Sequence, residues 1–289
     1  MILMQVPANI YERCVYVYMT LLLCDLLTIV FDSHSKKTTL ILLDLFIKLM
    51  AASNNLMLWT NNGNVVLRAN GTAVVIQRYI QWGHTTPTML IMLGYLSDSS
   101  CFQLLPTLVW NELMIMTGMC AAVTVGFVSF VSCCLSFACF VPVVWGMRSM
   151  FSVIIHATHK LGHPRDVKSL WMIQQATICI WSLFGVIFVL GELKVVSMPV
   201  YESMMAYVDF AAKVIFSNSL LLRNTRSIEI KRWAMMRTIE LFGKEKVRRP
   251  TSPAVNLLST CFTPCCCFAN QSIDTLYVNT SGKVHLYPL

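Results

Sequence analysis

Charge is scarce in this chain. Only 12% of its 289 residues are Asp, Glu, Lys or Arg, whereas 56% are hydrophobic, and the mean hydropathy is +0.63. Soluble domains carry about 25% charged residues. The composition therefore predicts a polytopic membrane protein in contact with membrane lipid, and it favours no nucleic-acid partner. No cleavable signal peptide is expected, because Glu12 and Arg13 precede an apolar run long enough to be a span.

The chain also lacks a disulfide pattern and any metal-ligand spacing. Eight of its twelve cysteines lie before residue 180, mostly in apolar segments, where cysteine behaves as a small hydrophobic residue. The "CFTPCCCF" cluster at 261–268 contains Cys265–Cys267 without a neighbouring histidine. It predicts acylation near the membrane rather than metal binding. We expect no metal site.

Seven stretches have the roughly 20 apolar residues that a transmembrane helix needs. They are 11–31, 38–60, 78–97, 105–125, 128–156, 169–192 and 200–224. Between residues 104 and 147 the only charge is Glu112, so two spans joined by a tight turn near Gly126 are expected there. The predicted fold is an all-α membrane protein, a bundle of seven transmembrane helices over residues 1–226. Residues 227–289 are a basic, cysteine-rich tail and not an enzyme module.

Lys and Arg in short loops indicate which ends of the spans are cytoplasmic. One side holds the 32–37, 98–104 and 157–168 loops and the C-terminus, with Lys36, Lys37, Lys160, Arg165, Lys168, Arg223 and Arg226; the other holds Arg13, Arg68 and Lys194. We therefore expect a plasma-membrane protein whose N-terminus is outside the cell and whose tail is in the cytoplasm. The "NGT" at Asn70 then lies outside, as a glycosylation acceptor or an ordinary turn.

The last span, which contains "YVDFAAKVIF", has a lysine at its centre and an aspartate four residues earlier. A charge at the middle of a membrane helix costs at least ~2.5–3.5 kcal/mol and usually marks function. Lys213 and Asp209 lie on one helix face, which fits a structural ion pair. It also fits a buried amine that condenses with an aldehyde, with Asp209 as counter-ion of the resulting cation.

The third span helps to decide between these interpretations. Its "RYIQWGHTTP" has the form RY–x–x–W–x–x–TTP. Together with D–x–x–x–K in the seventh span, it resembles the microbial (type 1) rhodopsins over residues 10–225. The resemblance implies all-trans retinal bound to Lys213 as a Schiff base, with Asp209 as counter-ion. It also implies retinal contacts from Trp82, Thr85, Thr86, Met114, Gly118, Trp181, Phe184 and Phe188. The fifth span, "FVSFVSCCLSFACF", lacks the family's tryptophan pair, so no pocket residue is assigned there.

The departures from the family pattern indicate function. Where proton pumps of the family carry a proton-accepting carboxylate, this chain has Gln81, and at the proton-donor position it has Met92. Neither side chain can take up a proton at physiological pH. An outward proton pump is therefore not expected, and "QTM" at positions 81, 85 and 92 does not resemble the motifs of the family's sodium or chloride pumps. The chain resembles channelrhodopsin-like or sensory members that lack the third-helix carboxylate.

Polar residues in the second and third spans favour a light-gated channel. Ser53, Asn54 and Asn55 are deep in the second span and, with Gln81 and Arg78, predict a route poor in acids, which suits anions such as chloride. The acid of the second span is Asp44, with Lys48 one turn on. A buried pair, or a lysine that extends its charged end towards the membrane surface, fits these two residues as a structural feature.

Alternatives remain open. A sensory rhodopsin acting through its tail or a partner is the second hypothesis, and a light-driven ion pump is the third. His84 is off the retinal-facing stripe and fits packing, a homo-oligomer contact or a proton acceptor. Residues 227–249 fit an amphipathic helix on the inner leaflet or an extension of the seventh helix.

Overall fold

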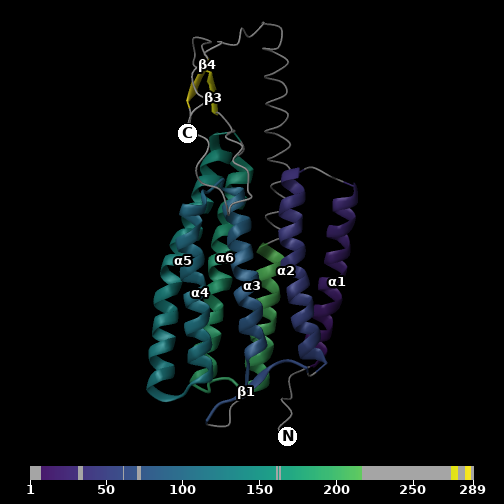
Figure 1. Cartoon of the computed structure of the whole chain (residues 1–289), viewed down its shortest axis with the longest axis vertical. Coiled ribbons are helices and arrows are strands. Elements are labelled where there is room, and N and C mark those ends of the chain that lie inside the picture. The colour runs from purple at the N-terminus through teal and green to yellow at the C-terminus, as the bar shows by residue number, and fades with distance from the viewer. Residues whose placement is uncertain are drawn as a thin grey trace, which may run out of the picture. The chain divides into compact units, whose positions relative to one another are not determined.

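The chain divides into two units, Met1–Arg237 and Thr238–Leu289. In the first unit, the structure describes a bundle of seven helices and one short strand pair. The computed structural model describes residues 8–31, 35–60, 62–69, 73–160, 162, 164–216, 275–278 and 284–287. The helices are α1 (Ala8–Phe31), α2 (Ser35–Trp59), α3 (Ile76–Leu96), α4 (Cys101–Val123), α5 (Gly126–Lys160), α6 (Pro164–Glu192) and a seventh helix over residues 198–216. They run side by side in one bundle (Figure 1). The expected seven-helix architecture is confirmed.

Among the described residues, five helices are long and apolar enough to cross a membrane. These segments are Asn9–Val30, Thr38–Trp59, Cys101–Val123, Gly126–Lys160 and Pro164–Glu192. The other two helices, α3 and the seventh, are less apolar because they carry buried polar side chains, among them Gln81, Asp209 and Lys213. A helix satisfies its own backbone hydrogen bonds in lipid. The two polar helices can therefore turn their polar side chains towards the interior of the bundle.

The turn between α4 and α5 lies where the sequence predicts it. Thr124 and Val125 separate the two helices, and Gly126 has a φ of +68°. Residues with a Cβ rarely adopt this left-handed conformation, so glycine allows the chain to reverse within two residues. The tight turn packs α4 directly against α5.

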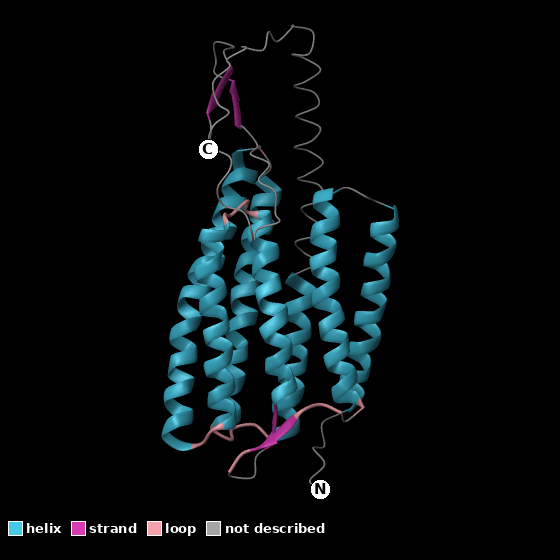
Figure 2. Cartoon of the chain, in the orientation of Figure 1, coloured by secondary structure: helices cyan, strands magenta, loops and turns pink. Residues whose placement is uncertain are grey.

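Two short antiparallel strand pairs were not predicted (Figure 2). In the α2–α3 connection, β1 (Val65–Leu67) pairs with β2 (Ala73–Val75), with Val65 opposite Val75. We call this end of the bundle the hairpin end. In the second unit, β3 (Thr275–Val278) pairs with β4 (Val284–Tyr287). The predictions for Asn70, residues 227–249 and Cys265–Cys267 fall outside the described residues.

The largest apolar core lies in the half of the bundle away from the hairpin end. It joins side chains of α2, α3, α5, α6 and the seventh helix, including Leu40, Met92, Met147, Phe151 and Phe216. Met92 is completely buried in this cluster. The core therefore places apolar side chains, Met92 among them, between the Lys213 region and that end of the bundle.

Candidate functional site

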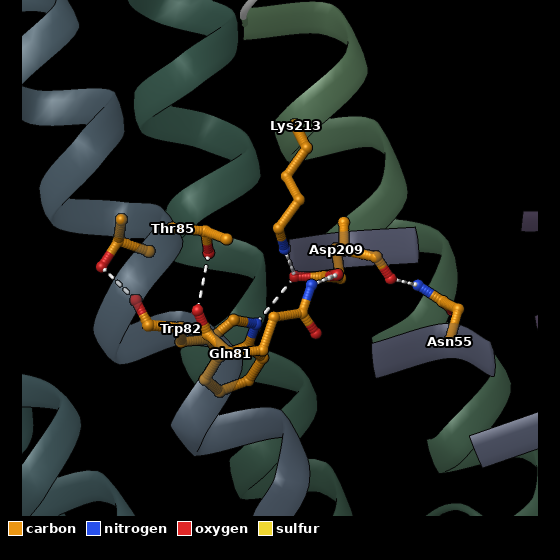
Figure 3. A network of polar contacts seen from close by, with 8 residues as sticks. Asn55, Gln81, Trp82, Thr85, Asp209 and Lys213 are labelled. Carbon is orange, nitrogen blue, oxygen red and sulfur yellow. Dashed lines mark hydrogen bonds and ion pairs between the residues drawn. The ribbon is translucent and has the colours of Figure 1, made fainter. Parts of the chain in front are cut away.

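Lys213 and Asp209 form a buried ion pair at the centre of the bundle. The side chains are 2% and 9% exposed, and the Lys213 Nζ donates a hydrogen bond to Oδ1 of Asp209. Their spacing of four residues places them one turn apart on the inward face of the seventh helix (Figure 3). Such a pair survives burial only when further hydrogen bonds satisfy its charged groups.

Two side chains of α3 supply those hydrogen bonds to Asp209. Trp82 Nε1 donates to Oδ1 at 2.7 Å, and Gln81 Nε2 donates to Oδ2 at 3.2 Å. Thr85 supports the arrangement from one turn further on, where its Oγ1 donates to the Gln81 backbone carbonyl at 3.0 Å (Figure 3). Gln81 is thus a neutral donor to the carboxylate and not a second anion beside it.

A cavity of about 310 Å³ extends from this ion pair between α3, α4, α5, α6 and the seventh helix. Among the residues that the sequence analysis singles out, those that line it are Trp82, Thr86, Met114, Gly118, Trp181, Phe184, Phe188, Asp209 and Lys213. Thr85 does not line the cavity; it is fully buried behind it. The predicted positions from four helices therefore converge on one space.

The fifth helix also contributes to the cavity. Cys133, Ser136, Phe137 and Phe140 of α5 line it. The sequence analysis missed these residues because they include no tryptophan and because α5 is apolar on all sides. Their spacing of three to four residues is the signal that marks them as one helix face.

The cavity fits a long apolar molecule with an aldehyde at one end. Its walls are aromatic and aliphatic, and the Trp82 ring packs edge-on against Phe184 with ring centroids 4.9 Å apart. At Gly185, an added Cβ would lie 2.6 Å from the Phe137 ring, so glycine keeps the wall clear. The Lys213 amine is the group that could form a covalent bond with such an aldehyde, and Asp209 could balance the resulting cation.

The residues predicted to form an ion pathway separate into different places. Asn54 and Asn55 are buried, whereas Ser53 is exposed on the surface of the bundle and is not brought together with them. Asn55 Nδ2 donates to the Ala51 carbonyl at 2.7 Å. In the described part of the chain, the side-chain oxygens of Asn54 and Gln81 are buried without a hydrogen-bond partner.

Arg78 lies nearer the hairpin end, where it is engaged in a second buried ion pair. Its guanidinium pairs with Glu202, whose Oε2 also accepts a hydrogen bond from Tyr11 at 3.3 Å. Arg68 holds the same end together: it pairs with Glu192 at 2.8 Å and donates to the Ala121 carbonyl at 2.8 Å. The Arg68 contacts join the α2–α3 connection to α4 and α6, and the Glu202 contacts join α1, α3 and the seventh helix.

A third buried charge cluster joins α1 and α2. Lys48 Nζ lies 2.7 Å from Oδ2 of Asp44 and 2.6 Å from Oδ2 of Asp25. Lys48 and Asp44 are 1% and 0% exposed. The sequence analysis expected the Asp44–Lys48 pair but missed Asp25, which is 23 residues away on another helix. The signal available in the sequence was Asp25 itself, an isolated acid in the apolar first span.

Comparisons with known proteins agree with this geometry. Residues 9–227 match the sequence family described as "Bacteriorhodopsin-like protein". Halorhodopsin from Natronomonas pharaonis is 26% identical over 160 residues, 53% of this chain and 52% of that protein, so the chain spans about half the length of this curated relative. The transmembrane domain of Salpingoeca rosetta rhodopsin phosphodiesterase superposes with a TM-score of 0.66 at 19% identity, over 76% of this chain and 84% of that one. A structure described as "Halorhodopsin, a light-driven chloride pump" superposes with a TM-score of 0.61 at 20% identity, over 75% of this chain and 97% of that chain.

Proposed function

The chain belongs to the bacteriorhodopsin-like family, whose members bind retinal, and from this premise we propose that it is a light-activated retinal receptor that conducts anions. All-trans retinal is the proposed chromophore, bound through its aldehyde to Lys213. When bound, retinal would supply light absorption and the change of shape that follows it. Asp209 is the proposed counter-ion, because it is the carboxylate that contacts the Lys213 amine.

The cavity walls orient the chromophore in this proposal. Trp82 and Trp181 would lie against the faces of the polyene, and Met114 and Gly118 would contact its ring. Phe184 and Phe188 complete the apolar wall contributed by α6. Thr86 would contact the chromophore near Lys213, whereas Thr85 would act from behind the wall by holding Gln81.

Proton pumping is disfavoured by the residues on both sides of Lys213. Next to Asp209, the α3 side chain is the neutral Gln81, which donates a hydrogen bond and cannot store a proton. Towards the end of the bundle away from the hairpin, Met92 is buried in an apolar core. A proton leaving or reaching Lys213 would have no carboxylate at either position.

Anion conduction is supported chiefly by the unpartnered buried amides of α2 and α3. The oxygens of Asn54 and Gln81 have no partner among the described residues. Buried polar groups of this kind are normally satisfied by protein or by ordered water. A hydrated seam lined by neutral amides, with Arg78 nearer the hairpin end, suits small anions such as chloride better than cations. Ser53 is not part of this route, because it is exposed on the bundle surface.

A sensory role is the second candidate, and one observation favours it. The apolar core around Met92 and Phe151 closes the half of the bundle away from the hairpin end. A bundle closed in this way could pass the light signal to its tail or to a partner protein without conducting ions. The similar rhodopsin phosphodiesterase is matched through its transmembrane domain, so we propose a non-enzymatic role here.

Voltage-clamp recording separates these functions. Light should produce a current in cells expressing the protein, and its reversal potential should follow the chloride potential when chloride is replaced by a large anion. Lys213→Ala is the control and should give no photocurrent. A current of fixed direction without reversal would indicate a pump, and a coloured protein at the cell surface without any current would indicate a sensory receptor.

The accessibility of epitopes at the two termini tests the proposed orientation. We place the hairpin end and the N-terminus outside the plasma membrane and the tail in the cytoplasm, because Lys and Arg are more numerous in the loops at the other end. An epitope fused to the N-terminus should then be accessible to antibody on intact cells, whereas one fused to the C-terminus should be accessible only after permeabilisation.

A further inference from the structure

Tyr18 of α1 is a completely buried tyrosine that the description of the site does not use. Its side chain is 0% exposed, and its hydroxyl makes no hydrogen bond within the described part of the chain. The ring packs edge-on against Phe210, the residue after Asp209, with ring centroids 5.4 Å apart. Buried hydroxyl groups are normally satisfied by protein or by ordered water, because an unmade hydrogen bond is costly. The position of this hydroxyl therefore needs an explanation.

The register of α1 against the seventh helix places Tyr18 beside Asp209. Both helices begin at the hairpin end (Figure 1), where Tyr11 Oη donates to Glu202 Oε2 at 3.3 Å. Two helical turns further on, after seven residues in each helix, come Tyr18 and Asp209. Because the two helices run in the same direction, Tyr18 lies at the depth of Asp209. The two groups are close enough to interact electrostatically.

The Asp209 carboxylate can accept another hydrogen bond. Its Oδ1 accepts from Lys213 and from Trp82, and its Oδ2 accepts from Gln81 at 3.2 Å. An ionised carboxylate has about four lone-pair sites, so these three donors leave room for one more. The three donors come from α3 and the seventh helix. A donor from α1 would fix the carboxylate from a third helix.

Asn54 supplies a second unpartnered group on the helix that packs against α1. Ala51 of α2 belongs to the same buried cluster as Tyr18. Asn54 follows Ala51 by one helical turn, is 4% exposed, and its Oδ1 makes no hydrogen bond among the described residues. One hydroxyl donor and two oxygen acceptors, on Asp209 and Asn54, are the partners that one water molecule can join. A buried water typically makes about three hydrogen bonds.

We propose that Tyr18 is a positioning residue for Asp209 and acts through one ordered water, which accepts from the Tyr18 hydroxyl and donates to Asp209 and Asn54. The water holds the carboxylate beside Lys213 and disperses part of its negative charge. In this way α1 takes part in the site, although none of its described residues lines the cavity. The inference rests on the proposed function, in which Asp209 balances the charge of the retinal linkage.

Tyr18→Phe tests the hydrogen bond, because it removes the hydroxyl and keeps the ring that packs on Phe210. The Tyr18→Phe pigment should absorb at a shorter wavelength than the unmodified pigment. A carboxylate that loses a donor attracts the cation at Lys213 more strongly, and light absorption moves that positive charge away from the carboxylate. Tyr16→Phe is the matched control: it removes a hydroxyl from the same helix where the side chain is 59% exposed, and it should keep the absorption maximum.

Asn54→Leu tests whether Tyr18 and Asn54 share one water. If they do, either single variant disturbs the same molecule, so both should shift the absorption maximum in the same direction. The combined variant, Tyr18→Phe with Asn54→Leu, should then shift it by less than the sum of the two single shifts, as expected for coupled residues. Shifts that add would show that the two residues act separately and would overturn the shared water.

A crystal structure of the retinal-free protein that resolves ordered water tests the inference without the chromophore. A water should lie within hydrogen-bond distance of the Tyr18 hydroxyl and of an Asp209 oxygen, and it should be lost in Tyr18→Phe. The inference is wrong if no water joins these groups, or if the Tyr18→Phe pigment absorbs at the same or a longer wavelength. If the unmodified protein forms no pigment with retinal, the proposed function fails, and the crystal structure alone decides whether Tyr18 positions Asp209.

Discussion

Removing the charge of Asp209 while keeping its shape tests the central feature of the site. Asp209→Asn preserves a carbonyl oxygen that can still accept the hydrogen bond from Trp82 Nε1, which is 2.7 Å long in the native site. It removes the anion that pairs with the Lys213 nitrogen. It also replaces Oδ2, the acceptor for Gln81 Nε2, by an NH2 group, so the Gln81 amide must rotate to present its oxygen there. The loss of the charge is the larger change, so the result reports on the counter-ion.

The size of the effect follows from Coulomb's law. Opposite unit charges about 4 Å apart at an effective dielectric constant of about 20 attract by about 4 kcal/mol. Each 1.36 kcal/mol corresponds to about a tenfold change in a protonation equilibrium. Losing Asp209 should therefore favour the neutral form of the retinal linkage by about a thousandfold. At neutral pH the absorbance should move from the visible to the near-ultraviolet, and acid should restore the visible band.

The assay is an absorption titration of the purified pigment with and without chloride. Asp44→Asn is the matched control: it removes another buried membrane carboxylate, one that lies 2.7 Å from Lys48. This control should keep its visible band. A visible band in Asp209→Asn at neutral pH without chloride would refute the assignment of Asp209. A band that appears only when chloride is added would show that chloride can replace the carboxylate.

Three further results are expected. Lys213→Ala should abolish pigment colour while the protein is still made, whereas Lys48→Met should keep the colour. A coloured Lys213→Ala protein would show that retinal is not bound to Lys213. Cells in unbuffered medium should show no sustained, protonophore-sensitive acidification in light, because Gln81 cannot accept a proton. Gly146→Ala should lower stability by about 1–3 kcal/mol, since the new Cβ would collide with the buried Thr107 side chain. Thermal bleaching of the pigment measures this change, and an unaltered bleaching temperature would contradict the close packing of α4 and α5.

Features that depend on neighbours along one helix were predictable from the sequence. The four-residue spacing of Asp209 and Lys213 predicts their shared face, and the structure pairs them. Residues 104–147 carry no charge except Glu112 and are long enough for two spans, so a turn near Gly126 could be predicted. The structure has this turn, with Gly126 at a φ of +68°. Periodicity and residue type carry this information because helix geometry is regular.

Features that depend on contact between distant helices were not predictable. Asp25 meets Lys48, and Arg68 meets Glu192, across sequence separations of 23 and 124 residues. No local pattern reports such a contact. Ser53 illustrates the same limit: it lies next to Asn54 in the sequence, yet it is exposed on the bundle surface while Asn54 is buried. Three consecutive positions on a helix point in different directions, and only packing decides which is inside.

The Asp25–Lys48–Asp44 cluster has a consequence for how the protein is made. The helix that contains Asp25 leaves the ribosome before the helix that contains Asp44 and Lys48. Each charge alone at the centre of a helix opposes insertion by about 2.5–3.5 kcal/mol. Lys48 offsets part of that cost when it lies 2.6 Å from Asp25. The two helices should therefore enter the bilayer as a pair, with α1 retained beside the translocon until α2 arrives. Substitutions at Asp25 should then reduce the amount of protein that is correctly inserted and leave the colour of the inserted fraction unchanged.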